Sequence, residues 1–124
     1  MRSVLLIAPL LLCADAAAGQ PAAAPVQSIT LYNFGFGPSP LVLSAGRAVT
    51  LSFVNRSGGS HAFTAPVFFG RSQIISGSAP GGEIELRGGE RRSVTLVPAA
   101  GRYKVHCSHA FHSMFGMRTE VIVR

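Results

Sequence analysis

Residues 102–124 read RYKVHCSHAFHSMFGMRTEVIVR, and this stretch decides the fold class. Its two ends are dominated by alternation between apolar and charged side chains, which is the pattern of a half-buried β-strand. In the first strand, Cys107 shares a face with Tyr103 and Val105, while basic side chains occupy the opposite face. We therefore expect a β-protein in which the thiol of Cys107 points into the core.

Two other side chains that can bind metals also lie on faces expected to be buried. In the final strand, Met117 shares its face with Val121 and Val123, opposite the charged residues. Further upstream, His61 lies on the same side of the chain as Phe63. Strand parity alone thus predicts that a histidine, a cysteine and a methionine face the core.

The rest of the chain has the same period-two pattern, interrupted by turns rich in Gly and Pro. Strands are expected at residues 28–34, 41–44, 47–55, 83–87, 92–97, 102–107 and 117–124. Residues 65–80 are less regular and are expected to form a long connection with at most one short helical turn. Short strands at this spacing predict an all-β domain over residues 28–124, a Greek-key β-sandwich.

The N-terminal residues have the layout of a targeting segment. A basic start, an apolar run over residues 4–12 and a tail of small residues predict a signal peptide over residues 1–19, followed by a Pro/Ala linker over 20–27. The alternatives are a retained membrane anchor and lipidation of Cys13. The apolar run is shorter than the roughly 20 residues of a membrane-spanning helix, and Leu12 is too large for the usual lipoprotein signal. We expect a periplasmic or secreted protein, with no stable membrane insertion after signal cleavage.

Removal of the leader leaves Cys107 as the one remaining cysteine, in an oxidising compartment. Such a thiol is buried, reactive or bound to a metal. The formal net charge of +6 is unchanged, because Arg2 and Asp15 leave together. The basic residues are dispersed and are not interleaved with aromatics, so nucleic-acid binding is not expected. The charge favours encounter with an acidic protein partner.

Residues 103–117 contain three of the four histidines, the remaining cysteine and two of the three methionines. A thiolate with imidazoles suits copper or zinc, and a thioether adds a preference for copper. Two histidines, one cysteine and a weak axial methionine form the type 1, or blue, copper site of electron-transfer proteins. The composition of this segment therefore predicts one mononuclear copper ion.

This segment resembles the C-terminal motif of the small cupredoxins, the family of plastocyanin, pseudoazurin and azurin. Cys107 ends a strand, His112 and Met117 follow at intervals of four intervening residues, and a final strand follows Met117. The first histidine of the family pattern matches His61, after a turn that contains Asn55. The resemblance covers residues 28–124 and implies that His61, Cys107, His112 and Met117 bind the copper.

The sequence departs from that pattern in three ways. Ala62 stands where many members have an asparagine that helps to hold the ligand loops together, and residues 110–111 are Ala-Phe where many have Pro-Gly. There are also three extra potential donors, namely His106, His109 and Met114.

Each residue has a simpler interpretation as well. Cys107 and Met117 can be ordinary core residues, and Met114 can replace Met117 as the axial group. His61 and His112 can be solvated residues. We expect His106 and His109 to be solvated. We expect Met114 to form an apolar rim around His112 with Phe111 and Phe115, and ordinary loop packing is the alternative for these three side chains.

The resemblance implies a carrier that passes single electrons between larger redox proteins, and we expect a monomer. The alternative is a copper-handling module, that is, a chaperone, buffer or resistance protein, which the extra donors would suit. An oxidase or nitrite reductase needs a second copper centre, which four histidines in one domain do not readily supply. We therefore do not expect an enzyme.

Overall fold

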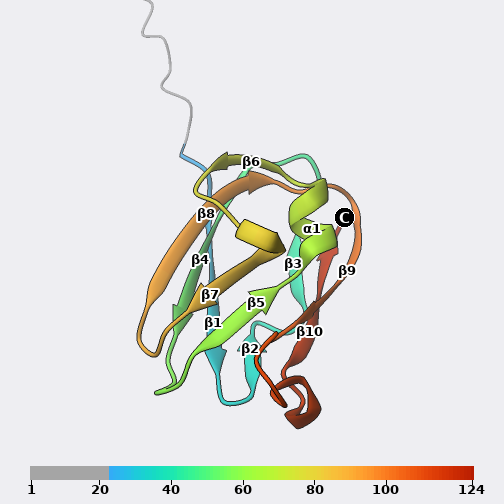
Figure 1. Ribbon diagram of the computed structural model, residues 1–124. Coiled ribbons are helices and arrows are strands. Elements are labelled where there is room, and N and C mark those ends of the chain that lie inside the picture. The colour runs from blue at the N-terminus through green and yellow to red at the C-terminus, as the bar shows by residue number, and fades with distance from the viewer. Residues whose placement is uncertain (1–22) are drawn as a thin grey trace, which may run out of the picture.

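The computed structural model describes residues 23–124, so the predicted leader and the start of the linker lie outside the described residues. Over this described range, ten strands form two five-stranded sheets packed face to face (Figure 1). The first sheet has the order β2 (Gly35–Gly37), β1 (Val26–Tyr32), β4 (Val49–Asn55), β8 (Arg91–Val97), β6 (Gln73–Ser76). The second has the order β3 (Leu41–Leu43), β10 (Arg118–Val123), β9 (Gly101–His106), β5 (His61–Thr64), β7 (Glu83–Leu86).

Most neighbouring strands are antiparallel, but β1 pairs with β4 and β3 pairs with β10 in parallel. The connection between β5 and β7 contains the short helix α1 (Pro66–Arg71), strand β6 and the 3₁₀ turn η1 (Pro80–Gly82). A second 3₁₀ turn, η2 (Ser113–Phe115), lies between β9 and β10. The predicted all-β sandwich is confirmed. Within residues 23–124, no helix is long and apolar enough to cross a membrane.

The core lies between the two sheets, where the apolar positions of the strands meet. Its largest fully buried side chains include Phe53 of β4, Phe63 of β5 and Phe68 of α1. In β9, Tyr103 and Val105 are buried, and Cys107 directly after the strand is 1% exposed. The predicted parity of this strand is confirmed, because its charged residues lie on the exposed face.

Three strands were not among those expected. Strand β5 is buried at all four positions and strand β6 is exposed at all four, so neither shows the alternation that identifies a strand in sequence. Strand β2 is a three-residue segment with two glycines. Strand β1 also begins at Val26, inside the predicted linker, because Val26 pairs with Thr50 of β4.

The two ends of the sandwich differ in what they contain. The connection between β9 and β10 and the turn between β1 and β2 lie at one end (Figure 1). The start of β1 and the C-terminus lie at the other end (Figure 1). There Ala45 N–H donates to the carbonyl of Arg124, and Arg124 N–H donates to the carbonyl of Leu43.

Candidate metal centre

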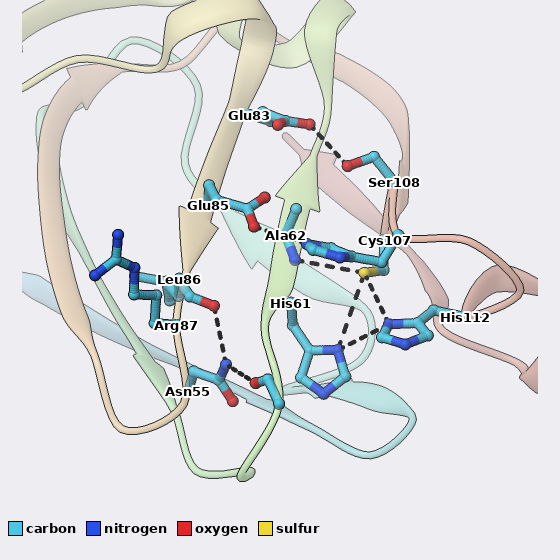
Figure 2. A network of polar contacts seen from close by, with 12 residues as sticks. Asn55, His61, Ala62, Glu83, Glu85, Leu86, Arg87, Cys107, Ser108 and His112 are labelled. Atoms are coloured by element: carbon cyan, nitrogen blue, oxygen red, sulfur yellow. Dashed lines mark hydrogen bonds and ion pairs between the residues drawn. The ribbon is translucent and has the colours of Figure 1, made fainter.

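Three predicted donors meet at the end of the sandwich that holds the β9–β10 connection (Figure 2). His61 is the first residue of β5, Cys107 directly follows β9, and His112 lies in the connection itself. The Nδ1 atoms of His61 and His112 are 3.1 Å apart, and Cys107 Sγ lies 4.0 Å from the first and 3.4 Å from the second. These separations suit donors that each lie about 2.0–2.3 Å from one shared ion.

His61 presents a defined nitrogen to this centre. Its Nε2 lies 2.7 Å from Asn33 Oδ1, and because an amide oxygen can only accept, Nε2 carries the proton. The lone pair of the neutral ring is therefore on Nδ1, which faces Cys107 and His112. Burial, and then the charges of His112 and His109, lower the pKa of His61 against a smaller opposite effect of Glu85. The ring is thus neutral and able to bind a metal at neutral pH.

The turn before His61 is fixed by a fully buried amide. Asn55 Nδ2 donates to the carbonyls of Gly59 at 2.8 Å and Leu86 at 3.1 Å. Its Oδ1 accepts from the N–H and the hydroxyl of Ser57. Both polar atoms of the amide are hydrogen-bonded, so Asn55 links β4, the turn and β7. These links fix the position of the start of β5, where His61 lies.

Cys107 Sγ accepts a hydrogen bond from the backbone N–H of Ala62 at 3.4 Å. This contact holds the sulfur against the start of β5, next to His61. The sulfur is buried between β5 and the β9–β10 connection, where solvent has no access. Cys107 is the free cysteine of the described residues.

Residues 107–117 form the ligand loop, which is closed at its base by backbone hydrogen bonds. Cys107 N–H donates to the carbonyl of Met117, and Met117 N–H donates to the carbonyl of His112, both at 3.1 Å. The side chain of Met117 is fully buried, whereas Met114 is 74% exposed. Of the two methionines in the loop, Met117 therefore has the inward placement that the sequence predicts.

His112 lies at the surface of the site and is half-buried. Its ring meets Phe34 edge-on, with centroids 5.2 Å apart, and His109 stacks on it at 5.5 Å and 25° between ring planes. Phe34 also contacts Phe115 at 5.3 Å. The exposed apolar side chains at this end form what we call the apolar rim, made up of Phe34, Phe111, Met114 and Phe115.

One expectation about this site needs revision, and one residue of the site was missed. His109 is not a solvated residue, because its Nε2 lies 2.7 Å from Glu85 Oε1 and its ring is against His112. Asn33 was not identified as a site residue. The sequence predicts a strand over residues 28–34 that includes it, but β1 ends at Tyr32 and Asn33 stands in the turn that follows. His106, by contrast, is exposed as expected.

The donor set fits copper. Two imidazole nitrogens and a thiolate sulfur converge, and a buried thioether belongs to a residue that is hydrogen-bonded through its backbone to two of the three donor residues. This is the donor set of a type 1 copper site. Its thiolate and thioether sulfurs favour Cu(I), and its imidazole nitrogens also bind Cu(II).

The family model of the cupredoxin-like domain matches residues 2–123, and the chain belongs to this family. No curated protein sequence matches the chain. Among solved structures, the sandwich is similar to auracyanin A, a blue copper protein from the green thermophilic photosynthetic bacterium Chloroflexus aurantiacus. The identity is 20% and the TM-score 0.60, over 82% of this chain and 100% of that one.

Two further similarities cover about the same share of this chain. A reduced auracyanin from the photosynthetic bacterium Roseiflexus castenholzii is 17% identical, with a TM-score of 0.60 over 82% of this chain and 98% of that one. A multicopper oxidase from Campylobacter jejuni is 16% identical, with a TM-score of 0.63, over 84% of this chain but 31% of the oxidase. At these identities the similarities establish the fold, and the functional argument depends on the site itself.

Proposed function

We propose that the protein is an exported, mononuclear type 1 copper protein that transfers single electrons between larger redox proteins. The observation that supports this most is the convergence of His61 Nδ1, Cys107 Sγ and His112 Nδ1 in one buried cluster whose outer member, His112, reaches the surface. When bound, copper would supply a centre that alternates between Cu(I) and Cu(II).

In this proposal the four side chains have different tasks. His61 and Cys107 are buried donors, held by Asn33 and by the N–H of Ala62. Met117 would supply its buried thioether as a weak fourth donor. His112 is the donor through which electrons enter and leave, because it alone of the four lies partly at the surface.

The apolar rim supports docking of a partner over His112. Its exposed apolar side chains would pack against a partner without needing hydrogen bonds, and they would exclude water from the contact. The redox group of the partner could then come close to His112. The formal net charge of +6 favours an acidic partner. Monomeric state, the absence of enzyme activity and location outside the cytoplasm are parts of the same proposal.

The metal assignment is tested by adding Cu(II) to the purified protein and recording its visible spectrum. An intense thiolate-to-copper band is expected, and Cys107→Ala should abolish it. His106→Ala is the matched control, because this exposed imidazole is next to Cys107 but on the opposite face, and it should keep the band. A colourless copper complex, or colour that persists in the cysteine variant, would refute the assignment.

One observation favours the copper-handling alternative. Met114 is the most exposed large apolar side chain of the rim, and its thioether could receive copper from another protein. His109, in contrast, is engaged by Glu85 and is less available as a transfer donor.

Electron self-exchange separates the two functions. It is measured by NMR line broadening in mixtures of Cu(I) and Cu(II) protein. An electron carrier should exchange rapidly and release copper slowly. A copper-handling protein should show slow self-exchange, and its metal-transfer rate should fall in the Met114→Leu variant.

A further inference from the structure

Two carboxylates on β7 remain without a role in the proposed function. Glu83 and Glu85 are two residues apart, so both project from the outward face of the strand, while Ile84 and Leu86 between and after them are buried. Strand β7 is the edge of its sheet, and β5 separates it from β9. Both carboxylates nevertheless contact the ligand loop, which begins beyond β9 (Figure 2).

The contacts bind the first two residues after Cys107. Ser108 Oγ donates to Glu83 Oε2 at 3.0 Å, and the same oxygen accepts from Thr64 Oγ1 of β5 at 3.0 Å. His109 Nε2 donates to Glu85 Oε1 at 2.7 Å. Two parallel links therefore cross β5 and fix the start of the loop to β7.

Ala62 makes this crossing possible. It pairs with Glu85 in the ladder between β5 and β7, and directly opposed residues project from the same face of a sheet. Its methyl group is fully buried although it is on the outward side. A longer side chain at this position would occupy the space over which His109 reaches Glu85.

The second link continues to the metal centre. The His109 ring that Glu85 holds is the ring that stacks on His112, while Phe34 contacts His112 edge-on. Phe111, Met114 and Phe115 of the same loop are largely exposed. The ring of His61 also lies against His112, with centroids 4.8 Å apart. Three rings therefore surround His112, and the one from its own loop, His109, is fixed by Glu85.

We infer that Glu85, acting through His109, is a positioning residue that holds the His112 imidazole in the orientation for metal binding; the inference rests on the proposed function in taking His112 as a ligand. An imidazole on an exposed loop would otherwise rotate, and ordering it at each binding event would weaken binding. The Glu85 contact lets the loop present Nδ1 to the site before a metal arrives.

The test compares Glu85→Ala, Glu85→Gln, His109→Ala and the double variant with alanine at both positions. Glu120→Ala is the matched control, because Glu120 lies on the same sheet with 46% exposure against 45% for Glu85, and it pairs with Arg102 away from the site. Three quantities are measured, namely Cu(II) release to excess EDTA, the visible spectrum of the Cu(II) protein, and amide hydrogen exchange of residues 108–112 in the metal-free protein.

Both single alanine variants should release copper about three- to tenfold faster, shift the relative intensities of the visible bands and exchange the loop amides faster. The double variant should release copper no faster than the single variants, because the same chain of contacts is broken in all three. Glu85→Gln retains an acceptor oxygen and should behave like the wild type, as should Glu120→Ala.

The inference is overturned if Glu85→Ala is indistinguishable from Glu120→Ala, if Glu85→Gln is as impaired as Glu85→Ala, or if the single effects add. Hydrogen exchange of the metal-free protein makes these outcomes independent of electron transfer. Slow self-exchange in the wild type would refute the carrier function and leave the positioning role intact, whereas wild-type loop protection in the alanine variants would refute the positioning role alone.

Discussion

The two ring nitrogens of His61 have different neighbours, and this difference makes the residue a directed donor. Nε2 donates to Asn33, while Nδ1 faces sulfur and nitrogen atoms of the metal centre. An imidazole without a partner for one nitrogen exchanges its proton between two tautomers, of which one has no lone pair on the metal side. Asn33 thus decides which nitrogen is free to bind.

Asn33→Ala should therefore weaken metal binding by about tenfold, at the lower end of the range for lost outer hydrogen bonds, because water can reach the turn. Asn33→Asp keeps an acceptor oxygen and should bind nearly as well as the wild type. Competition with a Cu(I) chelator of known affinity measures both. Equal loss in the two variants would show that the amide acts through the turn and not through His61.

The two methionines of the ligand loop should respond differently to leucine. Met117→Leu removes a buried thioether at nearly constant volume, so it should cost less than about 1.5 kcal/mol in stability while shifting the reduction potential and the visible spectrum. Met114→Leu should change neither, because its side chain is exposed. Cyclic voltammetry and absorption spectra of the two proteins provide the comparison, and a reversed pattern would make Met114 the axial donor.

The sequence pattern predicted the metal donors better than it predicted the residues that orient those donors. Cys107 directly follows β9 and Met117 directly precedes β10, and both strands alternate clearly, so the direction of the two side chains follows from parity. Asn33 and Glu85 act on His61 and, through His109, on His112 across long sequence separations, and nothing in the local pattern indicates which side chains will meet. Their roles emerge only from strand order.

Among the elements, the junction of α1 and η1 supports the strands behind the site. Gly82 has φ of +76°, and a Cβ there would meet the backbone Cα of Pro66 at the start of α1. The carbonyl of the same glycine accepts the N–H of Ala65 at 2.9 Å. The close approach therefore fixes the end of β5 against the start of β7.

Gly82→Ala should destabilise the metal-free protein by about 3 kcal/mol, the sum of a left-handed backbone penalty and an overpacking cost. Gly58→Ala is the control, since a Cβ at Gly58 meets nothing within 4 Å, and it should change stability little. Urea denaturation followed by far-UV circular dichroism gives both values. A Gly82→Ala protein as stable as Gly58→Ala would mean that α1 moves freely relative to η1.

At the level of elements, the sequence predicted strands with one buried and one solvated face, but not strands whose residues are all buried or all exposed. Strand β8 has its inward Val94 and Leu96 between less buried residues, and it is close to the predicted range. Strands β5 and β6 carry no such contrast, because the first is covered on both sides and the second is an exposed edge. Alternation in the sequence identifies a strand only when one of its faces is buried and the other exposed, so it identifies neither β5 nor β6.

For the whole molecule, the net charge predicts opposite salt effects on two reactions of one site. Self-exchange brings together two molecules of the same sign, so its rate should rise as salt screens their repulsion. Electron transfer to an acidic redox protein should slow over the same range. The screening length falls from about 30 Å at 0.01 M to about 8 Å at 0.15 M ionic strength, which defines the range to use.

NMR line broadening and stopped-flow absorbance measure the two rates. If both fall with salt, specific ion binding rather than net charge controls the encounter. If neither responds, the charges lie too far from the contact surface around His112 to influence docking.

The C-terminus lies at the end opposite the ligand loop, and this has a practical consequence for attaching the protein to an electrode. Strand β10 alone spans about 20 Å, at about 3.3 Å per residue. Immobilisation through a C-terminal thiol tag would therefore turn the metal centre outward, open to redox proteins in solution but distant from the conductor for direct tunnelling. A tether at position 114 would reverse the orientation and place the conductor where a natural partner is proposed to sit.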